Sequence, residues 1–250
     1  MESASVSEVG SDFAALERVV RSRRSVRAFE PDGVPDSVVR ACLELALLAP
    51  NSQNLHPLQF YVVRGRSEHA RMRAYCLDQP AAHSAPLFVV SVARPDFWRL
   101  GRRLNLEHYA RRGGTEAELR KFRRTVPLIF EDGPWHVLAP LKTLATTIAG
   151  WVRPTWRGPF GRSAQRVWAT KSAALACENL MLAFRAAGFD TCPMEGFDEP
   201  RVARLLGLPR AASVVMVLAV GRRAPGGVSE RPRFDREHFV KMVGANGGGT

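Results

Sequence analysis

The chain has 250 residues, of which 46% are hydrophobic and 24% are charged. These are the proportions of a globular protein with a sizeable core, and they exclude wholesale disorder, a collagen helix and a coiled coil. No apolar run approaches the ~20 residues that a membrane-spanning helix needs. The polar, acidic start of the chain lacks the basic and apolar parts of a signal peptide, so we expect a cytoplasmic protein.

The chain is strongly basic, with a net charge of +12 from 36 basic and 24 acidic residues. Such a surface favours anionic partners, among them phosphorylated cofactors, nucleic acids and anionic lipids. The four cysteines form no CxxC pair and lie at no metal-ligand spacing, so the pattern predicts reduced, mostly buried thiols and no metal site. They are Cys42, Cys76, Cys177 and Cys192.

Helices and short strands alternate along the chain. A first helix is expected to begin at Ser11 or Asp12, and a second is expected from about Asp36 to Pro50. Short apolar runs rich in Val are typical of buried strands, and a glycine after a periodic segment marks the end of a helix. These patterns predict strands at 58–63, 86–92 and 213–220, and helices at about 163–187 and 200–206.

Residues 94–162 differ in character from the rest of the chain. Asp96 is placed to cap a helix that ends at Gly113, and the segment from Thr115 to Glu118 has the form of a capping box. The segment 135–160 carries an apolar stripe at helical spacing. We predict an α/β (α+β) fold, a mixed sheet flanked by helices, in which 94–162 is a helical insertion or lid. A single domain is expected over 12–243, with flexible tails at 1–11 and 244–250.

Four segments carry side chains that suit a cofactor. The basic segment 23–27 and a second one at 231–233 offer guanidinium groups, which match phosphate oxygens, although the first alone is more often a solvated charge run. The polar loop 50–57 suits the edge of a flat heterocycle. The segment 188–198 is expected to form a cramped loop, in which Gly196 allows close backbone approach.

In this order and spacing, the four segments resemble the FMN-dependent nitroreductase family. The matching motifs are RRSVRAF at 23–29, APNSQNLHPLQFYVV at 49–63, GFDTCPMEGFD at 188–198 and RPRF at 231–234. The resemblance covers about 12–64 and 163–240. It implies a homodimer with two FMN sites, each built from both subunits. It also implies that NADPH or NADH reduces the flavin, which then reduces a nitroaromatic, a quinone or a similar conjugated acceptor by a ping-pong reaction.

The same resemblance implies roles for individual residues. Arg23 and Ser25, with Arg231 and Arg233, would hold the FMN phosphate and ribityl end, and Arg24 would sit beside them. Arg27 would reach the pyrimidine edge, where a fixed cation raises the electron affinity of the ring. The loop after Ala49 would line the ribityl chain and the ring, and the backbone after Cys192 would cover one ring face. No catalytic side chain is implied, and His56 is a candidate proton donor. The implied cofactor-binding residues are Arg23, Arg24, Ser25, Arg27, Pro50, Asn51, Ser52, Asn54, Pro193, Met194, Glu195, Gly196, Arg231 and Arg233.

Several alternatives stay open at this point. Relatives of the same fold include dehalogenases, enone reductases, flavin-fragmenting enzymes and oxidases of natural-product intermediates, and a non-catalytic protein that binds flavin or an anionic surface would keep the same motifs. Asn51, Ser52, His56 and Leu58 depart from the residues common among relatives, so the acceptor is not carried over. The arginine content favours NADPH over NADH.

Two further partner classes are weighed against the cofactor. Aromatic residues at 135–160 lie among basic ones, which fits a lid over the flavin, a contact with the partner subunit or a membrane-surface anchor, and we favour the first two. The arginine-rich stretch 94–124 has no helix-turn-helix pattern, stacking platform or KH-type loop, so its charge alone does not predict a nucleic-acid partner. The aromatic residues are Trp135, Trp151, Trp156 and Phe160.

Overall fold

The computed structural model describes residues 10–244. Four strands form one sheet in the order β1-β2-β4-β3, and each pair of neighbours is antiparallel. The strands are β1 (Leu58–Val63), β2 (Leu87–Ala93), β3 (Asp190–Met194) and β4 (Ser213–Gly221). Of the two predicted tails, residues 1–9 and 245–250 lie outside the described residues, and Ser11 already belongs to a helix.

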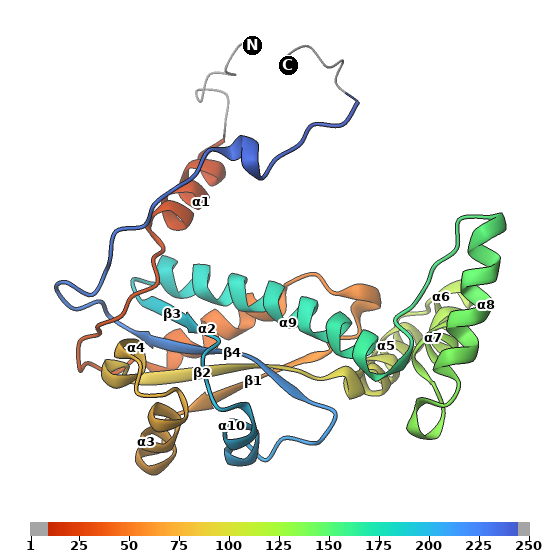
Figure 1. Ribbon diagram of the computed structural model, residues 1–250, viewed down its shortest axis with the longest axis horizontal. Helices are drawn as coiled ribbons and strands as arrows, with labels where there is room; N and C mark the ends of the chain where they lie inside the picture. Colours follow the sequence, from red (N-terminus) through yellow and green to blue (C-terminus); the bar gives the residue numbers. More distant parts are fainter. Residues whose placement is uncertain (1–9, 245–250) are drawn as a thin grey trace.

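Helices cover both faces of the sheet (Figure 1). Every residue of β2 is buried, and its successive side chains point to opposite faces, as the pleat of a strand requires. Phe88 and Val90 pack into one hydrophobic cluster with Met72 and Val202, whereas Leu87 and Val89 pack into a second cluster on the other face. The first face is covered by α3 (Arg66–Tyr75), α4 (Pro80–Ser84) and α10 (Glu199–Leu205), and the second by α2 (Asp36–Leu47) and α9 (Gly161–Ala186).

The segment 188–198 corrects the sequence prediction, because its first part is strand β3 rather than a loop. β3 lies at the edge of the sheet, where β4 is its neighbouring strand. Pro193 is compatible with a strand at that edge, since its missing N–H would be needed only by a second neighbour. Within residues 10–244 the parallel pairing of the predicted mixed sheet is limited to an isolated bridge between Ser25 and Thr191.

Part of the insertion packs into the core. A third hydrophobic cluster joins Trp98, Phe122 and Phe130 of the insertion to Trp168 of α9. The predicted capping box is confirmed at Thr115, whereas Asp96 does not cap the helix and pairs with Arg94 instead. The helical elements are α5 (Trp98–Arg111), α6 (Glu116–Arg120), a π-helical turn (Lys121–Thr125), α7 (Val126–Phe130) and α8 (Ala139–Val152).

A buried carboxylate fixes the connection between α7 and α8 onto α9. Asp132 accepts hydrogen bonds from the Gly161 backbone N–H at 2.7 Å, from Gln165 Nε2 at 2.9 Å and from Lys142 Nζ at 3.0 Å. Burial alone would raise the pKa of Asp132, but these bonds and one from His136 bring its pKa below the ordinary value. In contrast, Ala139 is the only buried residue of α8, which stands away from the sheet (Figure 1).

The two ends of the described chain leave the body of the protein together. Helix α1 (Ser11–Ser22) has no buried residue. Arg233 lines a hollow with Phe13, Leu16 and Val20 of this helix. Residues 229–243, which we call the C-terminal arm, therefore pass beside α1 in their first part and then extend away from it (Figure 1). Among residues 10–244, no helix is long and apolar enough to span a membrane.

Candidate functional site

The basic segment after α1 is held against β3 and the root of the C-terminal arm by backbone hydrogen bonds. The Val26 N–H donates to the Thr191 carbonyl at 3.1 Å, and the Arg27 N–H donates to the Gly227 carbonyl at 2.8 Å. The Arg24 guanidinium donates to the carbonyl of Ser229. Residues from both ends of the sequence therefore meet in one place. We call this region, residues 23–27 together with 227–233, the arginine half-site.

Glycine is required at the base of this contact. A side chain at Gly227 would bring its Cβ to 2.5 Å from the carbonyl oxygen of Ala28 and 3.0 Å from that of Ala224. Real Cβ atoms do not approach backbone this closely, so Gly227 lets the arm root lie directly on the segment that carries Arg27.

The arginine half-site concentrates positive charge. Desolvation, together with the like charges of Arg231, Arg24 and Arg23, lowers the pKa of Arg233, which shows that the guanidiniums of the two sequence ends lie within electrostatic reach of one another. Among the described residues, Glu178 is the one acidic partner of this group within 4.0 Å, at 3.8 Å from Arg23. Clustered guanidiniums with so little counter-charge form a donor set that fits a phosphate dianion such as that of FMN.

A buried ion-pair network, which sequence reasoning missed, positions the start of this segment. Asp190, the first residue of β3, accepts hydrogen bonds from Arg223 Nε at 2.8 Å and from Arg185 Nη1 at 3.1 Å. Arg185 Nε donates to the Ser22 hydroxyl at 3.0 Å, and Ser22 directly precedes Arg23. In the sequence, an acidic residue after Phe189 and an isolated arginine near a helix end give no reason to pair these residues.

β3 ends at Met194, and the predicted residues Glu195 and Gly196 follow it. Met194 is buried, whereas Glu195 and Gly196 are exposed. The Gln79 amide donates to the carbonyl of Gly196 and so holds the turn after β3, another contact that the sequence did not indicate. Arg27 lies close enough to this strand for its charge to oppose the effect of burial, which raises the pKa of Cys192.

The cysteines are buried and free, as predicted. Burial raises the pKa of Cys42 to about 11 and that of Cys76 to about 12. These thiols stay protonated at neutral pH and lack the reactivity of a thiolate.

The loop that precedes β1 forms a second candidate region, which we call the loop half-site and define as residues 50–56. Gln53, Asn54 and His56 have φ values of 60°, 54° and 45°, the left-handed conformation that residues other than glycine rarely adopt. Such backbone strain persists only where the surroundings hold it, and it is concentrated at functional sites.

Helix α5 holds this loop. Asn105 Nδ2 donates to the Asn54 carbonyl and to the Gly101 carbonyl, each at 2.8 Å. A Cβ on Gly101 would clash with the backbone of Leu55, so the helix and the loop are in direct backbone contact. Gly101 and Asn105 belong to the insertion, for which the resemblance gave no residue roles, and a glycine inside a helical pattern was the one signal available.

A cavity of about 620 Å³ opens on one side of the loop half-site. Pro50, Asn51 and Ser52 line it from the loop, and Trp156 and Arg157 line it from the connection between α8 and α9. The indole N–H of Trp168, which also lines this cavity, is buried and has no partner within residues 10–244.

The two half-sites do not form one pocket within a single chain. The loop half-site leads into β1 and the arginine half-site lies beside β3, at opposite edges of the sheet. Three strand spacings separate these edges, which is about 14 Å. The structure brings the predicted segment 23–27 together with the C-terminal arm beside Thr191 of β3, whereas the predicted residues 193–196 lie at the end of that strand. It keeps Pro50, Asn51, Ser52 and Asn54 apart from the arginines.

Comparison with known proteins adds to this geometry. A family model described as the nitroreductase family matches residues 20–222. The chain belongs to the nitroreductase family. This match confirms the predicted resemblance, and it includes the insertion that the sequence motifs left out. It ends before the arginines of the C-terminal arm.

Similar proteins support the same assignment of this nitroreductase-family chain. It is 32% identical to "Nitroreductase NfnB" of Mycolicibacterium smegmatis over 240 residues, which cover 89% of this chain and 93% of the relative. It is 27% identical to a Thermus thermophilus protein named "NADH dehydrogenase" over 205 residues, which cover 82% and 85% of the two chains. Relatives of these kinds support an oxidoreductase.

Solved structures confirm the fold class. A protein of Exiguobacterium sibiricum, solved in complex with FMN, has a TM-score of 0.68 and 20% identity, and the match covers 91% of this chain and 96% of that one. The enone reductase CLA-ER, from a gut-bacterial pathway, has a TM-score of 0.72 and 22% identity, with coverage of 94% and 99%.

Proposed function

We propose that the protein is an FMN-dependent oxidoreductase that acts as a homodimer, with NADPH or NADH as the reductant. The proposed acceptor is a nitroaromatic, a quinone or a similar conjugated molecule. The observation that carries the proposal is the arginine half-site, where cations from both ends of the chain gather beside an edge strand with one acidic partner. Bound FMN would supply the chemistry, the acceptance of hydride and its transfer to an acceptor.

The contribution of the chain is binding and orientation. Arg23, Arg24, Arg231 and Arg233 would hold the phosphate by charge-assisted hydrogen bonds. Arg27, exposed and close to β3, would place a fixed cation where the ring gains negative charge. The backbone from Pro193 to Gly196 would support one face of the ring, which requires no acidic or basic side chain.

A second copy of the chain is proposed to complete each site. The loop half-site of one copy would meet the arginine half-site of the other, because a single chain holds them at opposite sheet edges. Large apolar side chains stay exposed on the elements that leave the body, including Phe13, Leu16, Leu141, Trp151 and Phe234. Exposed apolar surface of this extent is typical of an interface. Helix α8 is proposed as the cover of the partner's site rather than a membrane anchor.

The first test is the visible spectrum of the purified protein before and after incubation with FMN. We expect flavin absorbance that bleaches when NADPH or NADH is added without oxygen, and we expect size-exclusion chromatography with light scattering to give a dimer. A protein that stays colourless would contradict the proposal. Vesicle flotation is expected to leave the protein in the soluble fraction with anionic lipids.

The same experiment separates the other candidates. Slow bleaching by both nucleotides would favour an oxidase or another reaction on the same fold, and a yellow protein that neither nucleotide bleaches would favour a non-catalytic flavin-binding protein. Arg27→Ala is expected to lower the reduction potential of the bound flavin or to weaken its binding, as measured by dye-linked reduction and by titration.

A further inference from the structure

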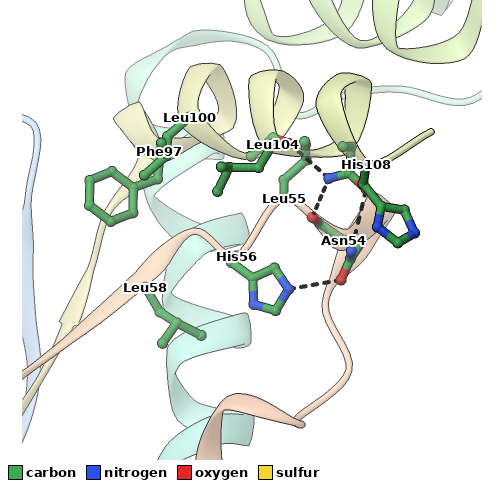
Figure 2. Close-up of a pocket in the computed structure, with 10 residues that line it drawn as sticks. Asn54, Leu55, His56, Leu58, Phe97, Leu100, Leu104 and His108 are labelled. Atoms are coloured by element: carbon green, nitrogen blue, oxygen red, sulfur yellow. Dashed lines mark hydrogen bonds between the residues drawn. The ribbon is translucent and has the colours of Figure 1, made fainter. Parts of the chain in front are cut away.

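A second cavity lies on the other side of the loop half-site and is built by one chain alone. It has a volume of about 380 Å³ and lies between the loop and α5 (Figure 2). Leu58 forms the loop side of an apolar wall, and Phe97, Leu100 and Leu104 form the helix side. His56 and His108 supply polar groups. Cavities of this size and character accept small molecules.

The lining excludes a charged ligand. None of the residues that line this cavity is Asp, Glu, Lys or Arg, although the chain as a whole carries a net charge of +12. A carboxylate or a phosphate in this place would have no opposite charge to offset its loss of water. The absence of charged lining residues distinguishes this cavity from the arginine half-site and from the 620 Å³ cavity, which Arg157 and Lys171 line.

A chain of hydrogen bonds fixes the role of each polar atom. Asn105 Nδ2 donates to two backbone carbonyls, so its Oδ1 accepts from Asn54 Nδ2 at 3.3 Å. Asn54 Oδ1 is then the acceptor for His56 Nε2 at 2.8 Å, and Nε2 must carry the proton (Figure 2).

The other ring nitrogen of His56 is available to a ligand. Within residues 10–244 its Nδ1 has no hydrogen-bond partner. In a neutral imidazole whose Nε2 carries the proton, Nδ1 is a lone-pair acceptor. Burial lowers the pKa of His56 and so favours the neutral ring. The complementary ligand group is a donor such as a hydroxyl or an amine N–H.

We infer that this cavity binds a small neutral aromatic molecule that carries a hydrogen-bond donor, with a phenol as the simplest example. The ring packs against Leu58, Phe97 and Leu104, and the hydroxyl donates to His56 Nδ1. The site uses the other side of the loop from the cavity that Asn51 and Ser52 line, and it takes in Asn54, which the resemblance had assigned to the flavin, together with His56.

The test is ¹⁹F NMR titration of the FMN-incubated protein with 4-fluorophenol, 4-fluoroanisole and 4-fluorobenzoate. We expect saturable binding of the phenol at millimolar concentration or below, and about 5-fold weaker binding of the other two, which lack a neutral donor. Equal binding of phenol and anisole, or no saturable binding of the phenol, would overturn the inference.

Substitutions in the cavity lining test where the phenol binds. Leu104→Trp fills the cavity and is expected to weaken phenol binding by about 10-fold or more, whereas Leu128→Trp, at an exposed leucine of α7 outside the lining, leaves it unchanged. His56→Phe keeps the ring contact but is expected to abolish the preference of phenol over anisole. If Leu104→Trp does not fold, Leu104→Gln serves instead, with a weakening of about 3-fold.

One outcome would place the phenol elsewhere. Binding that survives Leu104→Trp and produces a long-wavelength charge-transfer absorbance puts the phenol on the flavin ring, and it overturns the inference. Because the cavity needs neither flavin nor a second chain, a colourless protein that still binds 4-fluorophenol would refute the proposed function and retain this site.

Discussion

The two half-sites differ in how they are built. The arginine half-site joins segments that lie far apart in the sequence, as the separation of 205 positions between Arg24 and Ser229 shows. Its backbone makes ordinary strand-like hydrogen bonds, and its proposed functional side chains are arginines, of which Arg27, Arg231 and Arg233 are exposed and Arg23 and Arg24 are half-buried. The loop half-site consists of seven consecutive residues, its backbone is strained at Gln53, Asn54 and His56, and a helix from the insertion holds it in place.

This difference shows what each region needs from its surroundings. In the arginine half-site, the charges themselves are proposed to bind the phosphate, so the surrounding fold only has to bring two segments together. In the loop half-site the conformation is the functional feature, and it depends on contacts with Gly101 and Asn105 that do not touch the proposed cofactor. Variants in the first region should change ligand affinity, and variants in the second should change stability as well.

The largest effect is expected from the double variant Arg231→Ala, Arg233→Ala. The loss of two charge-assisted contacts should weaken FMN binding by about 100-fold or more and leave thermal unfolding of the cofactor-free protein unchanged. Fluorescence titration with FMN measures the affinity. The control is Arg123→Ala, Arg124→Ala, which removes the same charge from exposed positions in the insertion; an equal loss of affinity there would show that net charge alone attracts FMN.

The next effect is expected from Asp190→Asn. This change leaves the guanidiniums of Arg185 and Arg223 without their buried carboxylate, and it should lower the free energy of unfolding by about 3 kcal/mol in urea titrations. Asp78→Asn is the control, because its pair with Arg73 is exposed and should contribute less than about 1 kcal/mol. If both variants lose equal stability, the network does not position Ser22.

A pair of glycine substitutions tests the loop half-site. Gly101→Ala places a Cβ against the Leu55 backbone and should destabilise the protein by about 2 kcal/mol. In Gly150→Ala the new Cβ meets only the flexible end of Arg157, so a helix-propensity gain of up to about 1 kcal/mol is expected. Thermal and urea unfolding distinguish them. Equal effects would mean that α5 does not support the loop.

The smallest effect is a pH dependence of stability. Because burial lowers the pKa of His56 in the folded state, the unfolded chain binds the proton more tightly. The contribution of His56 to the free energy of unfolding is therefore fully present above the ordinary His pKa of about 6.5, and it is lost as the pH falls through the pKa of the folded state. Compared with His56→Gln, the unmodified protein should lose more stability between about pH 7.5 and about pH 5.5. Parallel urea titrations check this, and identical losses would contradict it.

The regular elements of the fold were largely predictable from the sequence. β1 occupies the predicted residues 58–63, and β2 and β4 differ from the prediction by one residue at their ends, because short Val-rich runs between turn residues have few other conformations. The edge strand β3 was missed, since Pro193 is a poor strand residue anywhere except at an edge. Helix α3 was missed as well, because Met72 is its only buried residue and its apolar stripe is weak.

The site was predictable only where charge or motif marked it. The sequence indicated the arginines at 23–27 and 231–233 and the polar loop, although their placement relative to bound FMN stays a prediction. It did not indicate Asp190, Gln79 or Asn105, because each acts through tertiary contacts with residues remote in sequence. The helix expected at 135–160 is shorter, as α8 ends at Val152, before Pro154 and Pro159 could interrupt it.

The hydrogen bond from Arg24 to Ser229 also has a consequence for biosynthesis. At translation rates of about 5 to 20 residues per second, the 205 positions that separate them take on the order of 10 to 40 s to add. During that interval the growing polypeptide already displays its early arginines on the ribosome, but it lacks their late counterparts. If FMN binds as proposed, tight binding of its phosphate has to wait until residues 229–233 have been added to the chain.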